Sequence, residues 1–169
     1  MKRKLIVACT ALVALALNVG AASVVPKIDL GGTWVLDASR SESVPRGMEQ
    51  TLMVTMAEDK IDIELKIKLP DGNERVIKDS YLPNGQQVEF TPPAPPGQTP
   101  PKGKRTVTWT ERGIEIKDER PVQTPEGPET VYDTRRWTLS ADGTLLIVEQ
   151  KSITPTGTQQ SRRTFVKKA

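Results

Sequence analysis

The chain of 169 residues has no histidine and only one cysteine, Cys9. It therefore cannot build a Ser-His-Asp or Cys-His nucleophilic centre, or a zinc site of imidazole and thiolate ligands. A single cysteine also excludes a disulfide within the chain. The sequence predicts that stability comes from a packed core, and it leaves only carboxylate, lysine, tyrosine or arginine chemistry, or a hard metal held by oxygen ligands.

The first 22 residues have the order of a secretory signal peptide. Basic residues at 2–4 precede an apolar run over 5–17, and small residues follow at 20–22. An apolar run of about 13 residues is too short for a membrane-spanning helix, which needs roughly 20. We expect cleavage after Ala21 or Ala22, a periplasmic or secreted location, and no transmembrane segment in the mature chain.

Removal of this segment also removes the net charge. Of the 24 Lys and Arg residues, three lie in the segment, so 21 remain against 21 Asp and Glu residues. A neutral mature chain lacks the excess positive charge by which proteins attract nucleic acids or anionic membranes. We therefore expect no nucleic-acid partner.

From Asp29 onward, apolar and polar residues alternate nearly everywhere, which is the period of strands with one buried face. The clearest case is 61–69, where five aliphatic residues alternate with charged ones. Turn sequences such as Pro83-Asn84-Gly85 and Asp142-Gly143 separate the strands. The pattern predicts about ten strands. They lie over 33–36, 52–56, 61–69, 75–82, 87–90, 106–110, 114–116, 130–140, 144–153 and 159–167.

Short hairpins between these strands favour a single all-β domain over 23–169. An antiparallel up-and-down barrel of about 8–10 strands would remove the exposed edges of such a meander, and a two-sheet β-sandwich is the alternative. Proline-rich stretches at 91–103 and 121–128 are predicted to be loops, because proline lacks the backbone donor that an interior strand needs. The first stretch could offer an extended segment to a protein partner.

The start of the mature domain, Asp29-Leu30-Gly31-Gly32-Thr33-Trp34, resembles the Gly-x-Trp signature of lipocalins and other calycins. It is most similar to a group of secreted bacterial lipocalin-like proteins. The resemblance implies a lipocalin-like barrel in which Gly32 turns the backbone into the wall and Trp34 closes one end. It also implies an arginine of the last strand, Arg162 or Arg163, packed over that tryptophan.

The resemblance further implies a cavity that carries a small apolar or amphipathic molecule. The predicted ligand-binding residues are Ile63, Leu65, Ile67, Val107, Ile116, Asp133, Arg135 and Trp137. Val54, Ile114 and Leu145 belong to the same predicted inward set. The alternative is that these side chains simply fill a core.

The polar members of this set come from one strand. Asp133, Arg135 and Trp137 alternate along 130–140, so they share one face. If that face is internal, the Asp-Arg pair lies among apolar neighbours and could orient a polar ligand head. A register slip would instead place Tyr132 and Thr134 inside.

Three classes of function remain open. The first, which we favour, is an exported carrier of a lipophilic small molecule. The second is a non-enzymatic envelope module with a filled core and a protein partner at the proline-rich loops. The third is a carboxylate enzyme, with candidates at Glu111, Glu115, Asp118 and Glu119. Strand alternation scatters these four acids over both faces, so we expect them to be solvated, and we expect no catalytic activity, cofactor or bound metal.

Overall fold

The computed structural model describes residues 27–92 and 99–168. The predicted signal peptide and part of the first proline-rich stretch, residues 93–98, lie outside the described residues. The described chain forms ten strands and one short 3-10 helix, η1 (Ala38–Arg40). The strands are β1 (Gly32–Leu36), β2 (Glu49–Met56), β3 (Ile61–Lys68), β4 (Glu74–Tyr81), β5 (Gln87–Phe90), β6 (Gly103–Thr110), β7 (Gly113–Thr124), β8 (Gly127–Leu139), β9 (Leu145–Thr154) and β10 (Gly157–Lys167).

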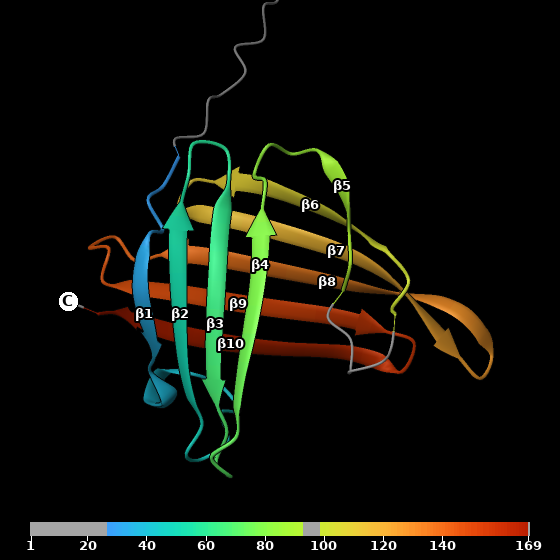
Figure 1. Cartoon of the computed structure of the whole chain (residues 1–169), viewed down its shortest axis with the longest axis horizontal. Helices are drawn as coiled ribbons and strands as arrows, with labels where there is room; N and C mark the ends of the chain where they lie inside the picture. The colour runs from blue at the N-terminus through green and yellow to red at the C-terminus, as the bar shows by residue number, and fades with distance from the viewer. Residues whose placement is uncertain (1–26, 93–98, 169) are drawn as a thin grey trace, which may run out of the picture.

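All ten strands belong to one antiparallel sheet with the order β4-β3-β2-β1-β10-β9-β8-β7-β6-β5. The sheet folds over itself, so that β1–β4 cross in front of β6–β10 in Figure 1. This confirms the predicted all-β, up-and-down meander, and one continuous sheet replaces the alternative of two separate sheets. Its two terminal strands, β4 and β5, are consecutive in the chain, yet no backbone ladder joins them among the described residues. We call this line between β4 and β5 the seam.

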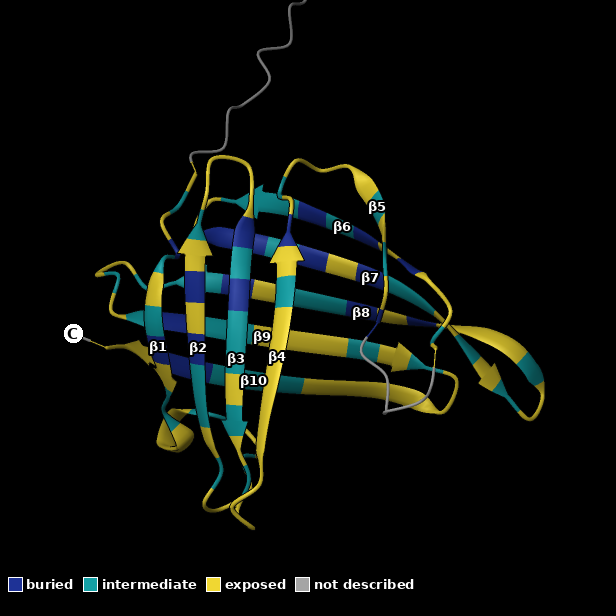
Figure 2. Ribbon diagram, viewed as in Figure 1, coloured by how far each residue is buried: buried dark blue, intermediate teal, exposed yellow. Residues whose placement is uncertain are grey.

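The alternation along each strand sends one set of side chains between the two layers. In the register of the front layer, Leu65 on β3 lies opposite both Leu52 on β2 and Ile77 on β4. Figure 2 shows buried residues where the layers overlap and exposed residues along β4 and at the tip of the β7–β8 hairpin. The core cluster is Leu30, Trp34, Leu52, Val54, Ile61, Ile63, Tyr81, Val107, Ile114, Ile116, Trp137, Leu146 and Phe165.

Trp34 is fully buried, as the sequence predicts, and its indole Nε1 donates a hydrogen bond to the carbonyl oxygen of Leu30 at 3.0 Å. The cation over its ring is Lys167, whose Nζ lies 5.2 Å from the ring centroid. The expectation of an arginine at this place is wrong. Lys167 is the direct cross-strand partner of Trp34, whereas Arg162 and Arg163 pair further along β9 and β10.

Gly32 adopts a φ of 132°, and a Cβ at this position would lie 2.9 Å from the Lys167 side chain. The backbone conformation and the closeness of Lys167 therefore both favour glycine at the entry to the first strand, as the sequence predicts.

The second proline-rich stretch is not the loop that the sequence predicts. Pro121 lies in β7 and Pro128 lies in β8, opposite Thr130 and Gln123 respectively. Strand β6 pairs with β7 only as far as Glu119, so the β7–β8 hairpin continues as a two-stranded ribbon beyond its neighbours (Figure 1). A ribbon with free outer edges accepts proline, because no further strand requires the missing donor.

A one-residue error affects β9. Leu146 is fully buried and Leu145 is only partly buried, so the predicted inward position of Leu145 belongs to its neighbour. Such a shift reverses the faces of the whole strand, because side chains alternate with a period of two. It also places Val148, Gln150 and Ser152 on the inner face.

Across the described ranges, no helix has the length and apolar character to cross a bilayer.

Candidate functional site

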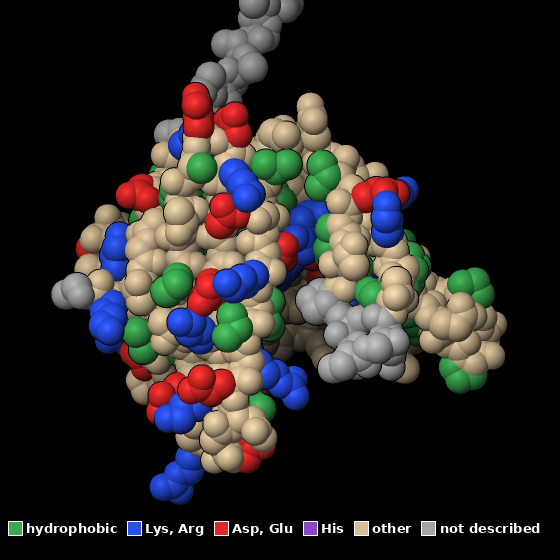
Figure 3. All heavy atoms as spheres, in the orientation of Figure 1, with side chains coloured by type: hydrophobic (Ala, Val, Ile, Leu, Met, Phe, Trp, Pro, Cys, Tyr) green, Lys and Arg blue, Asp and Glu red, His purple; other side chains and the backbone are tan. Residues whose placement is uncertain are grey.

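A cavity of about 400 Å³ lies between the two layers. Figure 3 shows a hollow near the seam in which acidic and basic side chains are visible. The cavity is lined by Gln50, Leu52, Ile63, Leu65, Ile77, Asp79, Tyr81, Phe90, Arg105, Asp118, Arg120, Asp133, Arg135, Trp137, Val148, Gln150, Ser161, Arg163 and Phe165. These residues divide into an apolar wall and a charged row.

The apolar wall comes mainly from the front layer. Leu52, Leu65 and Ile77 form a continuous row across β2, β3 and β4, and Ile63 adds to it from β3. Phe165 on β10 is 3% exposed and continues this surface from the back layer. The wall therefore offers a contiguous hydrocarbon surface without charged groups.

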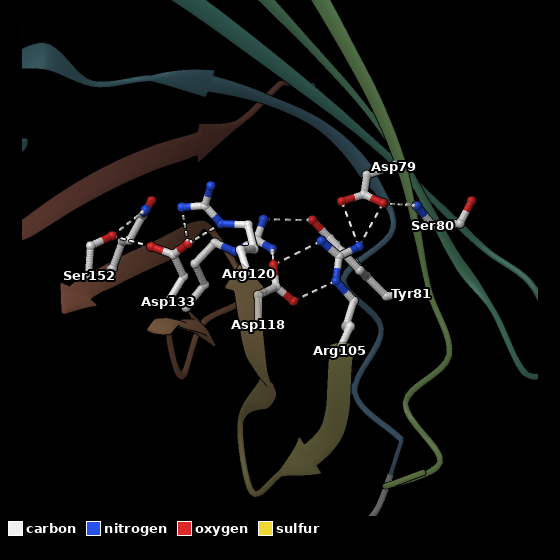
Figure 4. A network of polar contacts seen from close by, with 10 residues as sticks. Asp79, Ser80, Tyr81, Arg105, Asp118, Arg120, Asp133 and Ser152 are labelled. Atoms are coloured by element: carbon white, nitrogen blue, oxygen red, sulfur yellow. Dashed lines mark hydrogen bonds and ion pairs between the residues drawn. The ribbon is translucent and has the colours of Figure 1, made fainter. Parts of the chain in front are cut away.

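The charged row comes from alternate positions of three back-layer strands. It consists of Arg105 on β6, Asp118 and Arg120 on β7, and Asp133 and Arg135 on β8. Asp118 is the direct partner of Arg105 on one side and of Asp133 on the other. Carboxylates and guanidinium groups thus interleave across the inner face, as Figure 4 shows.

Arg105 is the centre of the row and is 4% exposed. Its Nε and Nη2 donate to the two carboxylate oxygens of Asp118 at 2.6 and 2.9 Å. Its Nη1 reaches across the seam to both oxygens of Asp79 on β4, each at 2.8 Å. Burial alone would lower the pKa of Arg105, but hydrogen bonds to Asp118 and Asp79 raise it overall, so the guanidinium stays charged.

Aromatic rings cover the same guanidinium from both edges of the seam. The Cζ atom of Arg105 lies 4.1 Å from the ring centroid of Phe90 on β5 and 5.1 Å from that of Tyr81 on β4. Cation–π contacts of this kind add to the ion pairs. The side chain of Arg105 therefore bridges β4 and β5 where the backbone ladder is missing.

Arg135 forms a second contact between the row and β4. Its Nη2 donates to Asp118 at 2.5 Å and its Nη1 donates to the phenol oxygen of Tyr81 at 3.1 Å. Burial is the main cause that raises the pKa of Tyr81 to about 12, so the phenol remains protonated at neutral pH. The Tyr81 ring also packs edge-on against Trp137, with ring centroids 5.8 Å apart.

Asp133 forms the far end of the row. It accepts from Arg120 Nε at 2.8 Å, and Ser152 on β9 donates to its other oxygen. The carboxylate is nearly buried, whereas the Arg120 side chain is one-third exposed. This end of the row therefore approaches solvent through its arginine.

The structure brings together five of the eight predicted ligand-binding residues. Asp133, Arg135, Trp137, Ile63 and Leu65 all line the cavity. The inward face of β8 is as predicted, and the alternative register is excluded because Tyr132 is 49% exposed. Asp133 and Arg135 do not pair with each other, however. Each bonds the residue diagonally opposite on β7 instead, Asp133 with Arg120 and Arg135 with Asp118.

The other three predicted ligand-binding residues do not line the cavity. Val107 and Ile116 are direct partners on β6 and β7 and are almost fully buried in the core. Ile67 lies near the end of β3, opposite Gln50 and Arg75, and is half-buried. For Val107 and Ile116 the alternative of a filled core is therefore the right one.

Of the two arginines predicted to close the barrel, only Arg163 faces the cavity. It also donates to the backbone carbonyl of Glu42, whereas Arg162 lies near Glu149 at 3.9 Å on the other face of the sheet. Arg163 therefore adds a fourth arginine to a lining that holds three aspartates.

Sequence reasoning missed most of the charged row. The predicted strand 106–110 begins one residue too late to include Arg105, although this residue has the same parity as the buried Val107. The expectation that Asp118 is solvated is wrong, because it is 4% exposed and shares the face of Ile114 and Ile116. The alternation of residues along β6 and β7 does place Arg105 and Asp118 on the inner face. The prediction put Asp118 in solvent because charged residues are usually exposed.

The other acids of that predicted cluster have different surroundings. Glu115 lies on the opposite face of β7 and pairs with Lys117 and Arg136, while Glu111 is exposed. Within residues 27–92 and 99–168, no group of three or more acidic residues is arranged to hold a metal ion.

Comparisons with known proteins give no family assignment. No family model matches the sequence, and no curated protein matches it. Among solved structures, the chain is similar to zebrafish ileal bile acid-binding protein complexed with cholic acid. The two chains share 16% identity with a TM-score of 0.46, and the match covers 82% of this chain and 98% of that one.

Proposed function

We propose that this protein binds one small amphipathic molecule in the cavity between its two layers. The apolar part of the ligand lies against the row of Leu52, Leu65 and Ile77, and its polar end faces the charged row. The observation that supports this proposal most strongly is the division of a single cavity into a hydrocarbon wall and a row of fixed charges. Such a division matches the two parts of an amphipathic molecule.

The size of the cavity also supports the proposal. A volume of about 400 Å³ lies within the range of roughly 300–1,000 Å³ that is typical of small-molecule sites. Most such sites combine apolar walls with a few polar groups at fixed positions, which set orientation and specificity. Here the polar groups are held in place by bidentate ion pairs.

The charged row itself argues against the alternative of a module with a filled core. Buried ion pairs generally stabilise a fold no better than well-packed apolar residues of similar volume, because desolvation offsets the attraction. A sheet that only needed a core would therefore gain nothing from three arginines and two aspartates on one inner face. We take the row to serve ligand recognition rather than stability.

The proposal is tested by titration with Nile red, an uncharged dye whose emission shifts to the blue in an apolar site. We expect saturable binding at one dye per chain. Leu65→Trp places a large ring in the cavity and should abolish the blue shift, whereas Lys66→Trp, on the opposite face of the same strand, should leave it unchanged. Circular dichroism confirms that both variants fold. Equal dye binding by both variants would refute binding in the cavity.

We also propose that the chain is an exported, lipocalin-like protein. The signal-like order of the first 22 residues and the Gly-x-Trp opening support this proposal. The mass of the protein isolated from the exported fraction of its host should correspond to a chain that begins after Ala21 or Ala22. A full-length mass in that fraction would contradict cleavage.

A further inference from the structure

We infer that the ligand is an acid, and that its anionic end is held at a corner of the cavity formed by Tyr81, Arg135 and Trp137. This inference rests on the proposed ligand-binding function and specifies the chemical class of the ligand. Its basis is a surplus of hydrogen-bond donors at this corner.

Arg135 provides the first of these donors. A guanidinium group has five N–H donors, and in the described part of the chain Arg135 uses them on only two partners, Tyr81 and Asp118. Its side chain is 21% exposed and lines the cavity, so donors remain for a bound molecule. The carboxylates of the cavity lining are already engaged, because Asp79, Asp118 and Asp133 each accept from an arginine.

Trp137 provides the second donor and an independent observation. The residue is 4% exposed and lines the cavity, yet its indole Nε1 has no hydrogen-bond partner among the described residues. A buried donor without a partner is rare in folded proteins, because it loses its bond to water and gains none in return. The other buried indole of the core, Trp34, has its N–H bonded to the Leu30 carbonyl. The Trp137 N–H is therefore a buried donor that the described part of the fold leaves without an acceptor, in a residue of the cavity lining.

Tyr81 completes the corner. Its phenol oxygen accepts from Arg135, and its own proton has no acceptor among the described residues. Burial raises its pKa to about 12, so this proton is present at neutral pH. The ring contacts Trp137 edge-on, and Arg135 lies two residues from Trp137 on the same face of β8. Three residues that carry donors therefore lie beside one another in the lining of the cavity.

This arrangement favours an anion over a neutral or cationic group. A carboxylate has two oxygens with about four acceptor sites and no proton, whereas an alcohol has one oxygen and brings a donor of its own. The charges agree, because four arginines and three aspartates line the cavity, and a single negative charge would balance them. A cationic group would be repelled by these arginines, and the carboxylates of the lining are already paired with arginines.

The inference is tested by displacement of Nile red at pH 8 with three ligands of equal chain length. They are dodecanoate, dodecan-1-ol and dodecyltrimethylammonium. Hydrogen bonds to a charged group are stronger than neutral ones, so dodecanoate should bind about tenfold more tightly than dodecan-1-ol. Dodecyltrimethylammonium should be the weakest competitor. Equal affinities of all three would overturn the inference and leave the proposed function intact, whereas absence of Nile red binding would overturn both.

Matched variants locate the anionic end. Arg135→Met and Trp137→Phe should each reduce the preference for dodecanoate over dodecan-1-ol by several-fold, with little change for the alcohol. Arg136→Met is the control for the first variant, because Arg136 points to the opposite face and pairs with Glu115. Trp109→Phe is the control for the second, because Trp109 does not line the cavity. A preference that survives both Arg135→Met and Trp137→Phe would overturn the assignment to this corner.

Discussion

Two buried regions of the same sheet have opposite compositions. Around Trp34, the back and front layers meet through apolar side chains such as Leu146 and Phe165, and the one polar atom of the indole is bonded to a backbone carbonyl. Around Asp118, the inner face carries interleaved guanidinium and carboxylate groups. We call these regions the apolar end and the charged row.

The two regions are expected to contribute differently to the stability of the fold. Burial of apolar surface is the main favourable term in folding, and the buried side chains of the apolar end contribute to it without buried charges. Buried ion pairs largely offset their own attraction through desolvation, but loss of one partner leaves an uncompensated charge. We therefore expect the apolar end to stabilise the fold outright and the charged row to be stable only as a complete set.

The largest expected effect is at the apolar end. Trp34→Ala removes a fully buried ring and should lower the free energy of unfolding by about 3–5 kcal/mol. Val76→Ala, at a residue 53% exposed on β4, should change it by no more than about 0.5 kcal/mol. Urea denaturation followed by circular dichroism measures both. An unchanged denaturation midpoint for Trp34→Ala would contradict the stabilising role that we assign to the apolar end.

The second effect tests whether the charged row behaves as a set. Asp118→Asn removes the charge that Arg105 and Arg135 share, and should lower the free energy of unfolding by about 3 kcal/mol. Replacing Arg105 and Asp118 together, by Met and Leu, should recover much of this loss, because the buried charges leave as a pair and Asp79 can be hydrated.

The control for the charged row is Glu115→Gln. This substitution breaks ion pairs with Lys117 and Arg136 on the opposite face of β7, where both basic side chains are more than half exposed. Glu115 itself is 16% exposed, but its partners reach into solvent, and pairs with solvated partners contribute about 1 kcal/mol or less. If Asp118→Asn proved no more destabilising than Glu115→Gln, the row would not be the coupled network that we describe.

The smallest effect concerns a turn beside the apolar end. Ser140 and Thr144 donate to Asp142 in the β8–β9 turn, and the Ser140 hydroxyl is the first of the causes that lower the pKa of Asp142 from 3.8 to about 2. Because the pKa is lower in the folded state, the ionised carboxylate stabilises the fold at pH values above 3.8, the pKa of the unfolded chain. This stabilisation is lost as the pH falls through about 2.

Wild type should therefore be more stable than Asp142→Asn at pH 6, and the difference should shrink as the pH approaches 2. Thermal unfolding across this range measures the trend, with Asp59→Asn as a control at an exposed acid of another turn. A difference that grew towards low pH would contradict the sign of this linkage.

The alternation of residues predicted the fold well because burial acts locally on each strand. The inward positions of Ile63, Leu65 and Trp137 follow from this alternation alone. The partners in the ion pairs cannot be predicted from this alternation, because they depend on the register between strands. Arg105 meets Asp79 and Asp118, which lie 26 and 13 residues away in the chain, and periodicity along one strand gives no information about either distance.

The same limit explains the error at Trp34. The resemblance placed an arginine over the ring, but the register between β1 and β10 puts Lys167 opposite it. The proline-rich hairpin shows a different limit. Pro121 and Pro128 led to the prediction of a loop. The β7–β8 ribbon accepts them because it extends beyond the neighbouring strands and so has free edges, which depends on the unequal strand lengths. The predicted partner of the first proline-rich stretch stays a prediction, since 93–98 lie outside the described residues.

The most direct test of ligand binding in this cavity uses the three tryptophan indole N–H signals in a ¹⁵N–¹H correlation spectrum, recorded during a titration with dodecanoate. The indole of Trp137, which lines the cavity and has no partner, should shift strongly downfield as it gains an acceptor. The indole of Trp34, already bonded to Leu30, should stay in place. A saturating titration that leaves the Trp137 indole signal unmoved would contradict the binding site described above.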